Sequence, residues 1–190
     1  MKNEITGMKL RLIVMNFLQF AVWGAYLTSM GTYLFNIGLG ARIGLFYAMQ
    51  GIVSLFMPAI MGIIADRWVP AQKLYGFCHF MAAVFMVAAG WYGYVDGEAV
   101  NFGTLFTFYS LSVAFYMPTL ALTNSVAYTA LDKVKLDPVI AFPPIRIFGT
   151  IGFICSMLLT DILGFQNNYM QFFSCACFGV ILAGYLVSFS

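Results

Sequence analysis

The chain has 190 residues, of which 62% are hydrophobic and only 8% are charged. Soluble globular domains contain roughly 25% charged residues, so this composition excludes a surface that faces water on all sides and favours a membrane protein. The formal net charge of +2 is too small for the basic stripe that nucleic-acid binding needs, so nucleic acid is excluded as a partner.

The first apolar stretch, residues 12–35, follows the basic residues Lys2, Lys9 and Arg11. At about 24 residues it is longer than the core of a signal peptide, and it has no obvious small-x-small cleavage site. We therefore expect this stretch to stay attached as the first membrane span.

The rest of the chain divides into pieces of similar size at its charged or turn-rich points. A helix needs about 20 apolar residues to cross roughly 30 Å of hydrocarbon. The predicted spans are 12–35, 43–65, 73–95, 102–131, 138–164 and 169–189. The connections are too short to be domains, so the predicted fold is an all-α membrane protein whose six transmembrane helices form one bundle over residues 1–190.

The basic residues of the short connections predict the orientation of this bundle, because Lys and Arg are retained on the cytoplasmic side. When the connections are assigned to alternate sides of the membrane, Arg42 is the single basic residue on one of the two sides. The residues expected on the opposite side are Lys2, Lys9, Arg11, Arg67, Lys73, Lys133 and Lys135. This distribution places both ends of the segment in the cytoplasm.

Span 1 contains a polar and aromatic stripe, Asn16, Gln19, Trp23 and Tyr26, within an arc of about 100° on a helix. Amides and aromatic rings on one arc are typical of a cavity wall, which makes Gln19 and Trp23 candidate solute contacts. Packing between helices through amides explains the same pattern equally well. Weaker stripes, which we interpret as packing, occur in spans 2 and 4: Tyr47, Gln50, Ser54, Tyr116, Thr119 and Thr123.

The end of span 2 carries Gly62, Asp66 and Arg67 at the expected cytoplasmic face. Asp66 can cap or pair with a neighbouring helix end, and Arg67 is a positive-inside anchor. A simple charged turn is the alternative. His79, the single histidine, lies just inside span 3, where a satisfied or snorkelling imidazole is favoured over a proton relay.

Arg146 is the most informative residue of span 5, because a charge within lipid is costly and marks a functional site by default. If the helix starts at Asp137-Pro138, a suitable cap and first-turn pair, Arg146 lies roughly 12 Å deep, near the midplane. If it starts at Pro143-Pro144, Arg146 reaches only the interface. We favour the deep position.

Thr150 and Phe153 follow Arg146 at the spacing that places three side chains on one helix face. A guanidinium offers several donors and no acceptor, which suits carbonyl or hydroxyl oxygens, and a phenyl ring can stack on a planar base. These three residues are therefore the principal candidates for binding a small polar solute that contains a ring.

The sequence offers no enzymatic or metal-binding motif. It lacks H-E-x-x-H, G-x-S-x-G and a phosphate-binding glycine loop, and its four cysteines have no C-x-x-C spacing, so we predict no enzyme, cofactor or metal site. No carboxylate is expected at mid-membrane. The titrating group of a proton-coupled carrier would therefore lie in sequence outside this chain.

Several segments combine aromatic, proline and glycine residues in a distinctive order. They are Phe17-Leu18-Gln19-Phe20 with Trp23-Gly24, Met57-Pro58-Ala59, Tyr116-Met117-Pro118-Thr119-Leu120, and Phe142-Pro143-Pro144-Ile145-Arg146-Ile147 running into Gly149-Thr150-Ile151-Gly152-Phe153. Together they resemble the bacterial nucleoside/proton symporters of the major facilitator superfamily. Residues 62–67 also resemble that superfamily's G-x-x-x-D-R/K signature between helices 2 and 3, although Val69 stands where glycine is usual.

This resemblance implies a carrier of two six-helix bundles in the bacterial cytoplasmic membrane, with a nucleoside bound between them. The chain would be the amino-terminal half, and the missing carboxy-terminal bundle would complete the pocket and supply the proton-coupling acid. Arg146, Thr150 and Phe153 match the family's span 5 segment and would line the site. The last span runs almost to Ser190 without a charged flank, which also suggests truncation.

The leading hypothesis is therefore proton-coupled nucleoside uptake by alternating access. A carrier of another small polar solute, such as a sugar or a drug, is the second hypothesis. A non-transporting membrane scaffold or subunit is the third, and it predicts a stop codon soon after Ser190, whereas truncation predicts an open frame that encodes about six further spans.

Overall fold

The structure, a computed structural model, describes residues 2–188, with Lys2 and Glu98 described by their backbone alone. Within this range all regular structure is helical. The helices are α1 (Lys2–Gly24), α2 (Met30–Asn36), α3 (Ile43–Arg67), α4 (Ala71–Asp96), α5 (Phe102–Tyr116), α6 (Thr119–Lys133), α7 (Pro138–Ile162) and α8 (Met170–Val187). Short 3-10 turns, η1 (Gly40–Arg42), η2 (Gly97–Ala99) and η3 (Phe165–Asn167), lie in three of the connections.

Among residues 2–188, six helical segments are long and apolar enough to cross a membrane, which confirms the predicted fold class. They are Asn3–Gly24, Gly40–Arg67, Ala71–Asp96, Phe102–Lys133, Pro138–Ile162 and Met170–Val187. The fourth segment combines α5 and α6. The regular helix is interrupted between them at Met117-Pro118, because proline cannot donate a backbone hydrogen bond.

The first segment differs from the predicted span 12–35. Its helix begins earlier, at Lys2, and ends at Gly24 before the chain continues as α2. The turn between them contains Ser29, whose hydroxyl lies 3.0 Å from Oε1 of Gln171 and 3.4 Å from the carbonyl oxygen of Tyr26. Serine hydroxyls that bond to nearby backbone groups compete with regular helix, so the polar turn interrupts an otherwise apolar stretch.

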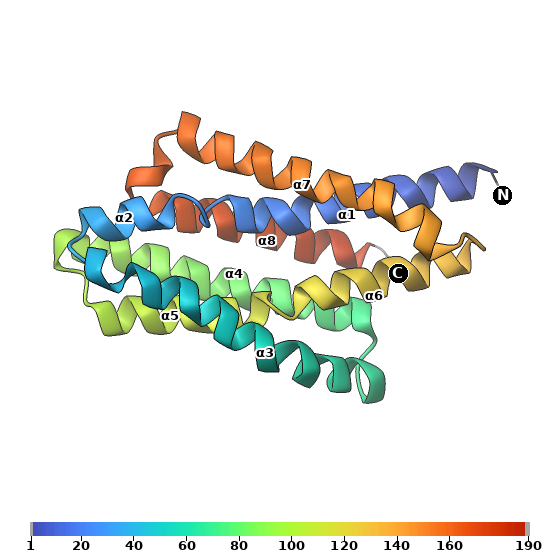
Figure 1. Cartoon of the computed structure of the whole chain (residues 1–190), viewed down its shortest axis with the longest axis horizontal. Helices are drawn as coiled ribbons and strands as arrows, with labels where there is room; N and C mark the ends of the chain where they lie inside the picture. The colour runs from blue at the N-terminus through green and yellow to red at the C-terminus, as the bar shows by residue number, and fades with distance from the viewer. Residues whose placement is uncertain (1, 189–190) are drawn as a thin grey trace.

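The two ends of the chain lie at the same end of the bundle. Figure 1 shows the amino and carboxyl termini at the same end as the α3–α4 and α6–α7 connections. The connections α2–α3, α4–α5 and α7–α8 lie at the other end. The basic residues Arg67, Lys73, Lys133 and Lys135 therefore share one end of the bundle, and Arg42 lies at the other.

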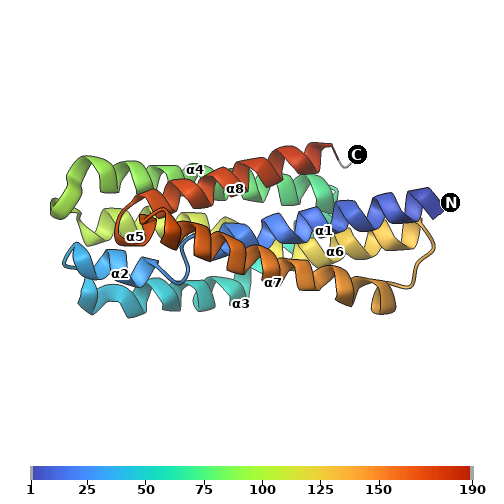
Figure 2. The ribbon, with the colours of Figure 1, turned by 90° about the horizontal axis from the view of Figure 1, so that it is seen from above.

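Different helices form the two opposite sides of the bundle. Figure 2 shows α4 and α8 along one side and α3 and α7 along the opposite side. In Figure 1, α3 and α7 form the two edges of that second side, with α1 and α6 between them. Helix α1 packs mainly against α7 and also contacts α8 and α6, while α4 packs mainly against α8. Such contacts in lipid depend on close van der Waals packing and interhelical hydrogen bonds.

Candidate functional site

Helix α7 begins at Pro138, as the deep position of Arg146 requires. The Asp137 carboxylate accepts a hydrogen bond of 2.9 Å from the backbone N–H of Val139, which satisfies a free donor at the helix start. Pro143 and Pro144 are accommodated inside the helix. Arg146 consequently lies roughly 12 Å along the helix axis from Pro138.

The guanidinium of Arg146 lies over the ring of Phe20 in α1, with 3.9 Å between the guanidinium carbon and the ring centroid. A cation above an aromatic face is attracted by the ring quadrupole, so this contact holds the side chain against α1. Arg146 is half-buried, and within residues 2–188 no residue accepts a hydrogen bond from its N–H groups and no acidic side chain pairs with it. They are available to a solute.

Gly149 makes the close approach of Arg146 and Phe20 possible. A Cβ atom at Gly149 would lie 2.6 Å from Cδ2 of Phe20 and 2.8 Å from Nη1 of Arg146. Real Cβ atoms are not found that close to other atoms. The glycine therefore leaves the space in which guanidinium and ring meet.

Thr150 and Phe153 continue the same face of α7. Thr150 is exposed, and Phe153 is half-buried with its ring at right angles to that of Trp23 in α1, the centroids being 6.3 Å apart. We call Arg146, Thr150, Phe153, Phe20 and Trp23 the α1–α7 wall. This wall combines a cation, a hydroxyl and three aromatic rings.

Trp23 is held in place by a chain of hydrogen bonds to the opposite edge of the bundle. Its indole Nε1 donates to Oε1 of Gln50 in α3 at 3.0 Å, and Nε2 of Gln50 donates to the hydroxyl of Tyr109 at 2.7 Å. Because Trp23 contacts both α7 and α3, the α1–α7 wall faces the side of the bundle that these two helices border (Figure 2).

Gln19 lies one layer behind the wall. Its side chain is completely buried, and its Nε2 donates to the hydroxyl of Thr119 at 2.8 Å. Its Oε1 accepts from the hydroxyl of Tyr75 at 2.7 Å and lies 2.6 Å from Nε2 of His79. Every polar atom of this amide therefore has a partner within the bundle, and Gln19 joins α1 to α4 and α6.

His79 is completely buried and does not snorkel to the interface. Its contact with Gln19 satisfies one ring nitrogen and requires a proton on Nε2, because the amide oxygen can only accept. Nδ1 of His79 is also buried but has no hydrogen-bond partner among the described residues, so the imidazole is only partly satisfied.

Gly62, Asp66 and Arg67 lie away from the wall, at the end of α3 near the chain termini (Figure 1). Asp66 and Arg67 are exposed, and Arg67 occupies the last helical turn, where a positive charge interacts favourably with the helix dipole. A Cβ atom at Gly62 would meet nothing within 4 Å. Asp66 and Arg67 therefore form a separate, exposed feature at this end of the bundle, one turn beyond Gly62.

Replacing Trp23 with phenylalanine is expected to lower stability by about 1 kcal/mol, because an aromatic ring remains beside Phe153 but Gln50 loses its donor. Thermal unfolding in detergent measures the effect. Trp91→Phe is the matched control, since Trp91 is 60% exposed and has no hydrogen bond among the residues described. Equal shifts for the two variants would contradict a role for the indole donor.

Comparison with known proteins identifies related transporters. Residues 6–189 match the family described as nucleoside H⁺ symporter. The xanthosine permease of Escherichia coli K12 is 38% identical over 181 residues, which cover 94% of this chain and 42% of the permease. The nucleoside permease NupG of the same strain is 39% identical over 179 residues, covering 93% of this chain and 41% of NupG.

A solved structure shares the fold. The crystal structure of the nucleoside transporter NupG superimposes with a TM-score of 0.88 at 37% identity, covering 96% of this chain and 44% of that chain. The chain thus spans less than half the length of the relatives that it matches.

Proposed function

Because this chain belongs to the nucleoside H⁺ symporter family, we propose that it forms the amino-terminal six-helix half of a carrier that takes up nucleosides together with protons by alternating access. The family match over nearly the whole chain is the observation that supports this most directly. The permease names of the relatives favour a transporter over an enzyme or a scaffold.

In this proposal the α1–α7 wall is one side of the nucleoside site. Arg146 donates to oxygens of the base or ribose, Thr150 adds a hydroxyl contact, and Phe153 stacks on the base. The free donors of Arg146 and the exposure of Thr150 support these roles. Trp23 borders the site, and Gln19 acts from behind by fixing α1 against α4 and α6.

The proton-coupling group belongs to the other half in this proposal. The seven acidic residues of the chain are Glu4, Asp66, Asp96, Glu98, Asp132, Asp137 and Asp161. Each lies at or near a helix end or in a connection, so none is placed at the centre of a membrane span. A carrier that moves protons needs a titrating group near that centre.

The carrier lies in the cytoplasmic membrane with both ends of this segment facing the cytoplasm. The clustering of basic residues at the end shared by the termini supports this orientation. Gly62, Asp66 and Arg67 then lie at the cytoplasmic face, where we propose that they hold the two bundles together in one of the alternating conformations. The second bundle docks on the side bordered by α3 and α7.

Uptake competition tests the substrate class. Cells that produce the complete carrier should accumulate labelled uridine, and unlabelled xanthosine or uridine should compete at least tenfold better than a hexose. Uptake should fall when the proton gradient is collapsed. Competition by hexoses instead would point to a sugar carrier, and a chain whose reading frame ends near Ser190 and that supports no uptake would point to a scaffold.

A further inference from the structure

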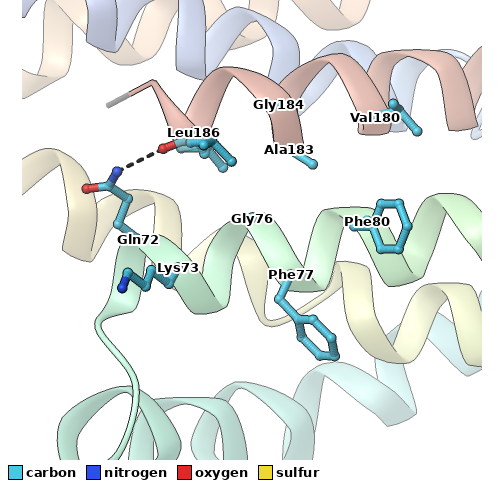
Figure 3. A pocket seen from close by; sticks show the side chains of 10 residues that line it. Gln72, Lys73, Gly76, Phe77, Phe80, Val180, Ala183, Gly184 and Leu186 are labelled. Carbon is cyan, nitrogen blue, oxygen red and sulfur yellow. Dashed lines mark hydrogen bonds between the residues drawn. The ribbon is translucent and has the colours of Figure 1, made fainter. Parts of the chain in front are cut away.

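A groove about 600 Å³ in volume lies between α4 and α8, on the side of the bundle opposite the α1–α7 wall (Figures 2 and 3). Its lining is mainly apolar. Phe77 and Phe80 of α4 and Val180 of α8 provide its side walls, and Gln72 and Lys73 lie at one end.

Two glycines line the groove, one on each helix. Gly76 lies on α4 and Gly184 on α8, and Figure 3 shows the backbones of both helices along the opening. A Cβ atom at Gly184 would meet nothing within 4 Å, so this position borders open space. A larger side chain at position 184 would therefore start from open space and extend into the groove.

The end of the groove is positively charged. Lys73 is exposed, and within residues 2–188 no acidic side chain lines the groove or pairs with its ammonium group. Gln72 is fixed beside it, because Nε2 of Gln72 donates to the backbone carbonyl of Leu186 at 2.8 Å (Figure 3). The groove runs from Lys73 to Phe80, roughly 10 Å along α4 toward the membrane interior.

The groove begins at an unpaired cation and continues as an apolar surface toward the membrane interior. A phospholipid has the matching arrangement, with a charged headgroup followed by an apolar acyl chain. The side formed by α4 and α8 faces lipid if the second bundle docks on the other side, and to that extent the inference rests on the proposed function. In the proposed orientation Lys73 lies at the cytoplasmic leaflet, whose anionic lipids attract basic residues. Positive charge at the groove entrance complements an anionic headgroup.

We propose that this groove binds one acyl chain of an anionic glycerophospholipid from the cytoplasmic leaflet, with the lipid phosphate beside Lys73 and the chain lying across Gly76 and Gly184. The lipid fills the open space beside Gly184, whereas α4 approaches α8 closely at Gly76, where a Cβ atom would lie 3.7 Å from the carbonyl oxygen of Ala183. Lys73 provides selectivity for anionic headgroups, and Gly184 provides room for the hydrocarbon.

Native mass spectrometry of the complete carrier tests this site with phosphatidylglycerol and phosphatidylcholine of identical acyl chains. The wild-type protein should retain phosphatidylglycerol about tenfold better than phosphatidylcholine. Lys73→Gln should remove this preference while leaving the groove intact, and Gly184→Phe should remove retention of both lipids. Lys9→Gln, a matched loss of an exposed lysine outside the groove, should behave as the wild type.

Equal retention of the two lipids by the wild type would overturn the proposal. It would also be overturned if the Gly184→Phe variant and the Lys73→Gln variant each retained phosphatidylglycerol as well as the wild type does. Loss of a dimer signal in Gly184→Phe would identify a second copy of the chain as the occupant and would also overturn it. Uridine binding, measured on the same samples, separates the two proposals: normal uridine binding without lipid selectivity refutes only the lipid site, and the reverse result refutes only the nucleoside site.

Discussion

Replacing Arg146 with alanine is expected to reduce uridine binding by the complete carrier about 10- to 100-fold while the helices still assemble. Hydrogen bonds from a charged donor contribute about 1.5–3 kcal/mol each, and Arg146 has donors that no residue in the described part of the chain occupies. Its contact with Phe20 is worth only about 0.5–1 kcal/mol at an exposed site, so the loss of stability should be small.

Isothermal titration calorimetry measures the loss, and a conservative variant sharpens it. Arg146→Lys keeps the charge but replaces a planar fork of donors with a single ammonium group, so it should restore binding only in part. Arg42→Ala is the matched control, because Arg42 also lies over a phenylalanine ring, that of Phe102 at 4.9 Å, but at the far end of the bundle. Unchanged binding in Arg146→Ala, or an equal loss in Arg42→Ala, would refute the assignment.

The start of α7 shows what the sequence can predict well. Asp137 and Pro138 form a local signal for a helix start, and it holds even though Pro143 and Pro144 follow within two turns. The depth of Arg146 along its helix follows directly from this local signal. Apolar length likewise predicts the number of spans, since the thickness of the bilayer sets it.

The stripe in span 1 shows where the sequence is insufficient. Periodicity places Asn16, Gln19, Trp23 and Tyr26 on one arc, but Gln19 and Tyr26 are buried in the bundle while Trp23 is half-exposed on the wall. Helix α1 contacts α6, α7 and α8, so the two edges of this stripe face different helices. Which edge faces a cavity depends on the packing of other helices, which periodicity does not contain.

Residues that complete the wall were also missed for this reason. Phe20 lies under Arg146, and Gln50 accepts from Trp23, yet the sequence places Phe20 in a family-like segment without marking it as a solute contact, and it favours packing for Gln50. Both contacts join helices that are far apart in the chain. The recurring glycines near Arg146 were the available signal, since a glycine within a membrane span often marks a close helix contact.

Replacing Gly152 with valine is expected to push α1 away from α7 and to prevent the α1–α7 wall from assembling. The free energy of unfolding should fall by about 3 kcal/mol or more. A Cβ atom at Gly152 would overlap the backbone of Phe17, coming within 2.9 Å of its Cα and closer still to its carbonyl oxygen. Gly24 of α1 meets α7 in the same way, at the carbonyl oxygen of Phe153 and the hydroxyl of Ser156. At Gly152 the nearest atoms are all backbone, and at Gly24 the carbonyl oxygen of Phe153 is backbone, so these atoms cannot rotate aside as a side chain can.

The loss should increase with side-chain size, so Gly152→Ala should lower the midpoint of thermal unfolding and Gly152→Val should lower it further or abolish a monodisperse peak in size-exclusion chromatography. Uridine affinity should fall in parallel, because Arg146 and Phe153 depend on α1 for their positions. Gly7→Val is the matched control, since a Cβ atom at Gly7 would meet nothing within 4 Å. A Gly152→Val protein that remains monodisperse and binds uridine normally would show that the contact between these two backbones does not hold the wall together.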